Sequence, residues 1–133
     1  MLGAAREAGV KRFIPSDFSL DMFKVKVGQI VSSDWRRQFA TIAEDECRGV
    51  EVVHVLNEGF LDRKVVFGFI NIISVDEQKA YFWGDGKQLM DYTTYADTAR
   101  YTAEVAVDDK SVPKVFSVAG DSLSFEEMES LRN

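Results

Sequence analysis

The sequence predicts an α/β fold built on a parallel sheet, and three observations lead to this prediction. Residues 10–14 have the pattern of a short strand, and the valine-rich residues 50–56 have the composition of a strand that is buried on both faces. A helical pattern lies between them, which is the order of a βαβ unit. A third apolar segment, residues 115–119, follows a second helical pattern. With 133 residues, 46% of them hydrophobic, we expect one domain with a substantial core.

The first elements follow from local signals. Residues 2–8 have the pattern of a helix, and Gly9 can end it in a left-handed conformation. The strand at residues 10–14 comes next and is closed by the turn residues Pro15 to Phe18. After an irregular stretch, Ser33 is predicted to cap a second helix, which Gly49 ends.

Apolar residues at helical spacing mark the expected buried face of this second helix. They are Trp35, Phe39, Ile42 and Ala43. The strand at residues 50–56 follows; its one histidine, His54, is interpreted as a core residue rather than a base.

The second half of the chain contains a turn signal and two capping signals. Residues 79–83 and 88–94 are interpreted as two arms of a hairpin around Gly84-Asp85-Gly86, while residues 60–74 are ambiguous. Thr94 and Ser124 each begin a capping-box pattern, so a helix is expected after each. Along the first of these helices a stripe of small residues is expected to pack closely on the sheet. The stripe consists of Ala96, Ala99, Ala103 and Val107.

Charge and composition exclude several classes of protein. The 16 basic residues are scattered among 22 acidic ones, for a net charge of −6, which argues against direct nucleic-acid binding. No apolar stretch is long enough to span a membrane, and no signal peptide is visible. A single cysteine cannot form an internal disulfide, so we expect a cytoplasmic protein.

Known catalytic and metal-binding patterns are missing. The sequence contains no G-x-G-x-x-G and no Tyr-x-x-x-Lys. One histidine and one cysteine cannot make a zinc site, so no metal is expected, and no catalytic residue is assigned.

The predicted site lies where the strands end. In open parallel sheets ligands bind at the carboxyl ends of the strands, so the loops 15–18 and 57–60 should share one edge. Aromatic residues could line an apolar pocket for a small molecule there, or could simply belong to the core. They are Phe18, Phe60, Phe67, Phe69, Tyr81 and Trp83.

The ordered series of motifs resembles the NmrA-like and isoflavone-reductase-like proteins, which are atypical short-chain dehydrogenases. Residues 4–18, AAREAGVKRFIPSDF, resemble their fifth helix–strand segment. Residues 49–62 are similar to their sixth strand and the loop after it. Residues 83–94 and 97–101 are similar to the substrate-side segment and the helix behind it. The resemblance implies a partial Rossmann-like parallel sheet with a small substrate-side segment that contains the hairpin.

The resemblance also implies an NAD(P) cofactor, with NADP slightly favoured. Its nicotinamide end would contact the two strand-end loops. The expected contact residues are Pro15, Ser16, Phe18, Asn57, Gly59 and Phe60. The family's phosphate-binding loop has no counterpart in this chain, so we expect residues 1–133 to be the central-to-C-terminal part of such a domain.

One departure from the family affects the expected function. Reductases of the family carry a Lys early in the helix between these strands, whereas Arg37 or Gln38 falls at that place here. Arg stays protonated and Gln does not titrate, so neither replaces Lys in proton transfer. This favours a redox-responsive, regulatory NAD(P)-binding protein. An NAD(P)H-dependent reductase of small aromatic or quinone-like substrates, and a fragment that binds no nucleotide but self-associates as a homo-oligomer, stay open as alternatives.

Overall fold

A parallel sheet forms the centre of the computed structural model, and its strands lie along three adjacent lines. The structure describes residues 1–46, 48–62, 64–66, 73–74, 76–77, 79–82 and 84–130. The middle line consists of β2 (Glu51–Val52) and β3 (His54–Leu56). β2 pairs with β1 (Arg12–Phe13), and β3 pairs on its other side with β8 (Val115–Ser117). All of these pairs are parallel, which confirms the predicted fold class.

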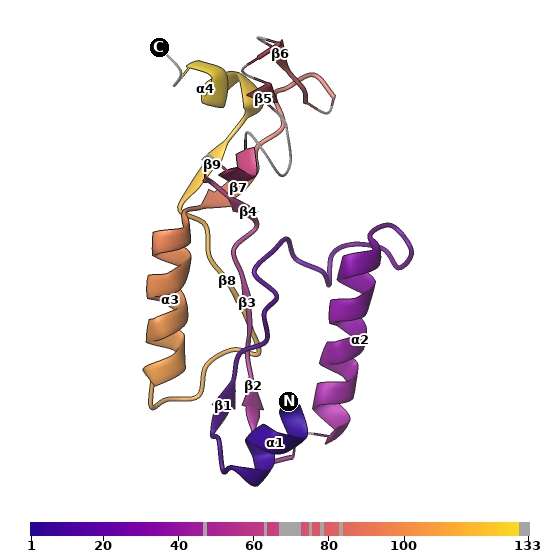
Figure 1. The fold of residues 1–133 in the computed structure, drawn as a ribbon, viewed down its shortest axis with the longest axis vertical. Coiled ribbons are helices and arrows are strands. Elements are labelled where there is room, and N and C mark those ends of the chain that lie inside the picture. The colour runs from indigo at the N-terminus through magenta and orange to yellow at the C-terminus, as the bar shows by residue number, and fades with distance from the viewer. Residues whose placement is uncertain are drawn as a thin grey trace.

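Two helices cover opposite faces of this sheet (Figure 1). On one face, Val52 packs with Ala43 of α2 (Val31–Glu46). On the other face, Val53 packs with Val105 of α3 (Tyr95–Val107). Successive strand residues point to opposite faces, so the packing of Val52 on one side and of Val53 and Val55 on the other reflects a sheet that is covered on both sides.

The predicted buried face of α2 is wrong in part. Trp35 is 67% exposed and Ile42 is 42% exposed, whereas Ser33, Ala40 and Ala43 are buried. The helix also begins at Val31, so Ser33 lies inside its first turn rather than capping it. Small side chains at the contact let α2 approach the sheet closely, and Phe39 packs beside them as predicted, while Trp35 and Ile42 are left outside.

The small-residue stripe predicted for α3 is also wrong. Ala96, Ala99 and Ala103 are exposed, and Val107 is 77% exposed. The residues of α3 that are buried are Thr98 and Val105. The threonine is accepted there because its hydroxyl donates to the Thr94 carbonyl oxygen at 2.9 Å.

A second, mixed sheet lies beyond the ends of β3 and β8 (Figure 1). Its middle strand is β7 (Met90–Thr93), which pairs in parallel with β4 (Gly59–Phe60) and antiparallel with β9 (Asp121–Leu123). The sequence analysis did not predict β9.

The hairpin expected around residues 84–86 is wrong as a pairing. Its first arm contains β6 (Lys79–Ala80), which pairs with β5 (Ile73–Ser74), and its second arm is β7. The turn itself is present, because Gly84 and Gly86 have φ values of 70° and 77°. Turn chemistry thus identified the bend but not the strands that flank it.

The predicted helix ends are confirmed at three places. Gly9, after α1 (Leu2–Glu7), has a φ of 69°. The Asp97 N–H donates to the Thr94 hydroxyl at 3.0 Å at the start of α3. Before α4 (Phe125–Ser130), the Glu127 N–H donates to the Ser124 hydroxyl and the Ser124 N–H donates back to the Glu127 carboxylate, at 3.2 and 2.8 Å.

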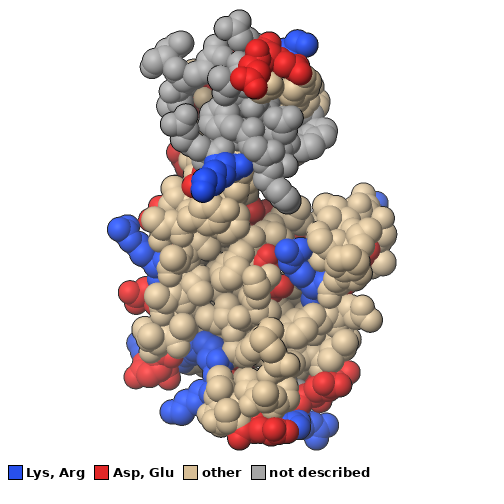
Figure 2. Space-filling view, viewed as in Figure 1, with Lys and Arg blue, Asp and Glu red and all other residues tan. Residues whose placement is uncertain are grey.

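Acidic and basic side chains are interspersed on the face shown in Figure 2, rather than gathered in separate patches. In the part of the chain that the structure describes, no helix is long and apolar enough to cross a membrane.

Candidate functional site

The loops that follow β1 and β3 lie side by side, as predicted. The Glu58 N–H donates to the Ser19 carbonyl oxygen at 3.2 Å, which ties the second loop to the first. This contact follows from topology, because β1 and β2 are parallel neighbours and β3 continues β2. The carboxyl ends of both strands therefore meet at one edge, where ligands bind in sheets of this kind.

Asn57 is the most unusual residue at this edge. It follows β3 directly and has no exposed area. Neither its amide nitrogen nor its amide oxygen has a hydrogen-bond partner among the described residues. Leaving such a group unpaired in the interior costs about 1–3 kcal/mol, so Asn57 is a donor and an acceptor that the described residues leave unsatisfied.

The backbone of both strand-end loops contains a constrained residue. Phe18 has a φ of 27° and Glu58 a φ of 55°, which is the left-handed region that ordinary residues avoid. Strain of this kind persists only where neighbouring contacts hold it, and it is concentrated at ligand sites. Here the two strained residues lie in the two loops that share the edge.

A buried pair of side chains fixes the first loop. The Asp17 carboxylate lies 2.6 Å from His54 Nδ1, and the two residues are 3% and 5% exposed. The Arg36 Nε lies 3.9 Å from the same carboxylate. The interpretation of His54 as a core residue is confirmed, but its buried partner in the loop could not be seen from the sequence, because 37 residues separate the two.

The two residues at the expected lysine place have other surroundings. The Arg37 guanidinium donates to the backbone carbonyl oxygens of Met22 and Val25, which fastens the segment after the first loop onto α2. Gln38 is exposed on α2. Arg37 is thus committed to the backbone of this segment, and it is not a group that can exchange a proton.

The other expected contact residues occupy mixed surroundings. Pro15 is buried, while Ser16 is exposed. At Gly59, an added Cβ would lie 2.9 Å from the ring of Tyr92, so this glycine is needed for close packing on β7. Phe60 packs against the ring of Tyr95, with centroids 4.2 Å apart.

The aromatic residues expected to line a pocket at this edge are not brought into one site. Phe18 packs on the Val53–Val55 side of the core, apart from the contact of Phe60 with Tyr95. Tyr81 is half-exposed and donates to Glu77 at 2.8 Å, next to β6. Phe67, Phe69 and Trp83 lie outside the described residues.

Burial raises the pKa of the Glu58 carboxyl above its ordinary value of 4.5, and the charges of Asp21 and Asp91 raise it further. The Asp21 N–H and the Lys24 ammonium oppose this effect. By contrast, the hydrogen bond from Arg12 lowers the pKa of Glu51. The two carboxylates therefore affect stability in opposite directions as the pH changes.

We expect Glu58→Gln to stabilise the chain at pH 7. The folded chain holds the Glu58 proton more tightly than the unfolded chain does, so ionised Glu58 opposes folding above its raised pKa. This opposition fades as the pH falls through that pKa and is gone below the ordinary 4.5. The gain from Glu58→Gln should fade over the same window, as measured by urea unfolding across the pH range.

Glu51→Gln is the matched control. It should destabilise the chain at pH 7, and the loss should shrink as the pH falls below 4.5 and through the lowered pKa of Glu51. If Glu58→Gln destabilised the chain at pH 7, the assignment of a raised pKa to Glu58 would be wrong.

Comparison with known proteins gives a consistent result. No family model matches the chain. The chain is 27% identical to isoflavone reductase homologs of Nicotiana glauca and Nicotiana tabacum over 135 residues, covering 98% of this chain and 44% of each relative. A crystal structure of isoflavone reductase matches with a TM-score of 0.74 and 25% identity, over 98% of this chain and 44% of that one.

These likenesses confirm the expected resemblance to isoflavone-reductase-like proteins and the Rossmann-like fold class. The chain spans less than half of the length of the relatives that it matches.

Proposed function

We propose, from the homology of this chain to isoflavone-reductase-like proteins, that its two strand-end loops hold the nicotinamide end of NAD(P). The observation that carries this proposal is the Asn57 side chain, which is fully buried at the end of β3 with both amide atoms unpaired. A nicotinamide carboxamide has one acceptor and one donor group, and it can satisfy both atoms at once.

Binding of such a ligand at this edge requires the chain around Asn57 to move. Because Asn57 has no exposed area, a ligand reaches it only when the chain around it moves, and we propose that the segment after Phe18, which Glu58 contacts through Ser19, is the part that shifts. That segment is held by the strained Phe18 and by the Glu58–Ser19 hydrogen bond, so binding can release strain as it forms new contacts. When bound, the nicotinamide ring supplies hydride chemistry. Pro15, Ser16, Phe18, Asn57, Gly59 and Phe60 would position the ring.

We propose a redox-responsive, regulatory role for this binding. Its support is the arrangement on α2: Arg37 is engaged by the Met22 and Val25 carbonyls, and Gln38 is exposed. Neither side chain can pass a proton to a substrate at neutral pH. A protein that distinguishes oxidised from reduced nucleotide without turning it over needs only the binding loops.

The names of the relatives support a second candidate, an NAD(P)H-dependent reductase of small aromatic or quinone-like substrates. In that case the proton would have to come from a group other than Arg37 or Gln38. Oxidation of NADPH by the purified chain with added quinone or isoflavone distinguishes the two candidates. Turnover that Asn57→Leu abolishes would favour the reductase, and binding without turnover would favour the regulatory role.

Binding is tested with the two halves of the nucleotide. We expect reduced nicotinamide mononucleotide to raise the melting temperature of the chain, because a ligand that binds only the folded state stabilises it by mass action. ADP-ribose, which lacks the nicotinamide, should have a smaller effect. At a concentration about 100-fold above the dissociation constant, the expected stabilisation is about 2.7 kcal/mol.

The variant Asn57→Leu should lose the shift with reduced nicotinamide mononucleotide while it keeps the fold, because it replaces an unpaired amide with an apolar group of similar size. Gln88→Leu is the matched control, since it replaces a side-chain amide with the same apolar residue at an exposed position. Equal shifts for the two variants, or a shift with ADP-ribose alone, would contradict the placement of the nicotinamide at Asn57.

A further inference from the structure

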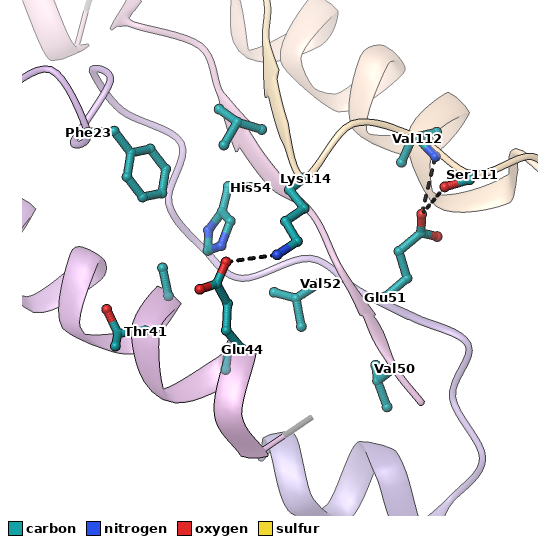
Figure 3. A pocket seen from close by; sticks show the side chains of 13 residues that line it. Phe23, Thr41, Glu44, Val50, Glu51, Val52, His54, Ser111, Val112 and Lys114 are labelled. Carbon is teal, nitrogen blue, oxygen red and sulfur yellow. Dashed lines mark hydrogen bonds and ion pairs between the residues drawn. The ribbon is translucent and has the colours of Figure 1, made fainter. Parts of the chain in front are cut away.

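We propose that a cavity on the α2 face of the sheet binds a small neutral aromatic alcohol or phenol through His54. The cavity has a volume of about 480 Å³ and lies between α2, the β2–β3 line and residues 111–115 (Figure 3). Its size is within the range of pockets that enclose small molecules. No residue of the strand-end loops 15–18 and 57–60 lines it, although Asp17 of the first loop holds His54, so the proposal does not require a nucleotide at those loops.

Asp17 sets the orientation of the His54 ring at the cavity. A carboxylate only accepts hydrogen bonds, so Asp17, at 2.6 Å, holds the imidazole proton on Nδ1. In the neutral imidazole, the other nitrogen, Nε2, carries a lone pair. Nε2 has no hydrogen-bond partner among the described residues, and His54 lines the cavity. The site therefore offers an acceptor at its inner end, and a ligand must bring a donor such as a hydroxyl group.

Apolar and aromatic side chains line most of the cavity wall around His54. Phe23 lies across from His54, with the two rings nearly perpendicular and their centroids 5.9 Å apart (Figure 3). The remaining apolar lining comes from α2, the strands and the residues that precede them. It consists of Ala40, Ala43, Val50, Val52, Val112 and Val115. A flat ring can bury its faces against these side chains while its hydroxyl points to Nε2.

The charged side chains around the cavity favour a neutral ligand. Two carboxylates line the cavity, Glu44 and Glu51. Glu44 accepts a hydrogen bond from Lys114 at 2.8 Å, which lowers the pKa of Glu44. Glu51 accepts from Arg12, which lies outside the cavity, and from the Val112 N–H at 3.2 Å. Both carboxylates are ionised, and Lys114 and Arg12 are already paired with them. A carboxylate or phosphate ligand is therefore disfavoured, and a neutral hydroxyl compound is preferred.

Three probes test this assignment: naphthol, naphthalene and naphthoate. We expect naphthol to bind, as followed by its fluorescence and by ligand-observed NMR. Naphthalene, which lacks the donor, should bind about fivefold more weakly, the value of one ordinary hydrogen bond. Naphthoate should bind more weakly than naphthol as well. Equal affinity for naphthol and naphthalene, or no binding of naphthol at millimolar concentration, would overturn the proposal.

Two variants locate the site. Thr41 is an exposed residue of α2 that lines the cavity, and Thr41→Phe should fill part of it and weaken naphthol binding at least about fivefold. Its neighbour Ile42 is exposed and does not line the cavity, so Ile42→Phe is the matched control and should leave the affinity unchanged. Equal affinities in both variants would place naphthol elsewhere and overturn the assignment.

The same variants separate this site from the nucleotide site. Thr41→Phe should leave the thermal shift with reduced nicotinamide mononucleotide unchanged, while Asn57→Leu should leave naphthol binding unchanged. Loss of naphthol binding in Asn57→Leu would show that the probe occupies the strand-end loops, which would overturn the separate site.

Discussion

Replacing Arg12 with Met is expected to lower the free energy of unfolding by about 3 kcal/mol. The Arg12 side chain is only 9% exposed and joins two parts of the chain that are far apart in sequence. Its guanidinium pairs with Glu51 at 2.7 Å. It also donates to the carbonyl oxygens of Val105, Asp108 and Lys110, at and just beyond the end of α3. Met fills a similar volume but leaves all of these acceptors without their donor.

Urea unfolding at neutral pH measures this loss. Arg100→Met is the control, because Arg100 is 81% exposed and its ion pair with Asp97, at 3.4 Å, is a surface contact. That substitution should change the free energy of unfolding by less than about 1 kcal/mol. Similar losses in both variants would show that Arg12 does not hold the end of α3.

Replacing Asp17 with Leu is expected to cost about 3 kcal/mol, for a different reason. Removing the carboxylate leaves the buried Nδ1 of His54 without an acceptor, and it also removes the charge that faces Arg36 at 3.9 Å. The loop between Pro15 and Phe18 then loses the contact that fastens it to the middle of the sheet. The loss should therefore appear both in stability and in faster hydrogen exchange of this loop.

A double-mutant cycle isolates the pair. His54→Leu alone should also destabilise the chain, because it strands the Asp17 carboxylate. The double variant should lose clearly less than the two single losses added together, since a buried pair replaced by apolar groups leaves no unpaired partner. Asp109→Leu, at an exposed position, is the control for the substitution itself. Additive losses would mean that Asp17 and His54 do not interact.

Much of the fold could be predicted because the relevant forces act over a few residues. The valine-rich segment at 50–56 indicated a strand that is covered on both faces, and the structure places β2 and β3 there. The capping patterns at Thr94 and Ser124 predicted helix starts, because a side chain satisfies backbone N–H groups only three residues away. The common edge for the loops 15–18 and 57–60 followed from parallel topology.

Most of the predictions that failed concerned which surface meets which partner, and the cap predicted at Ser33 failed because the helix begins two residues earlier. Residues 88–94 have the pattern of a strand, but the pattern does not reveal that β7 pairs with β4 and β9 rather than with its neighbour in sequence. Trp35 has the spacing of a core residue, yet the close approach of α2 to the sheet is made by Ala40 and Ala43. Both outcomes depend on the packing of segments that are distant along the chain.

The sequence by itself therefore determined the α/β class, the βαβ order, the helix ends at Gly9, Thr94 and Ser124, and the edge at which a ligand is expected. The tertiary structure alone decided that Asn57 is buried without partners, that Asp17 reaches His54, and that Arg37 is tied to the backbone of the segment beyond the first loop. The physical reason is range. Periodicity and capping are satisfied within one or two turns, whereas the burial and pairing of a polar group depend on which remote residues surround it in the folded chain.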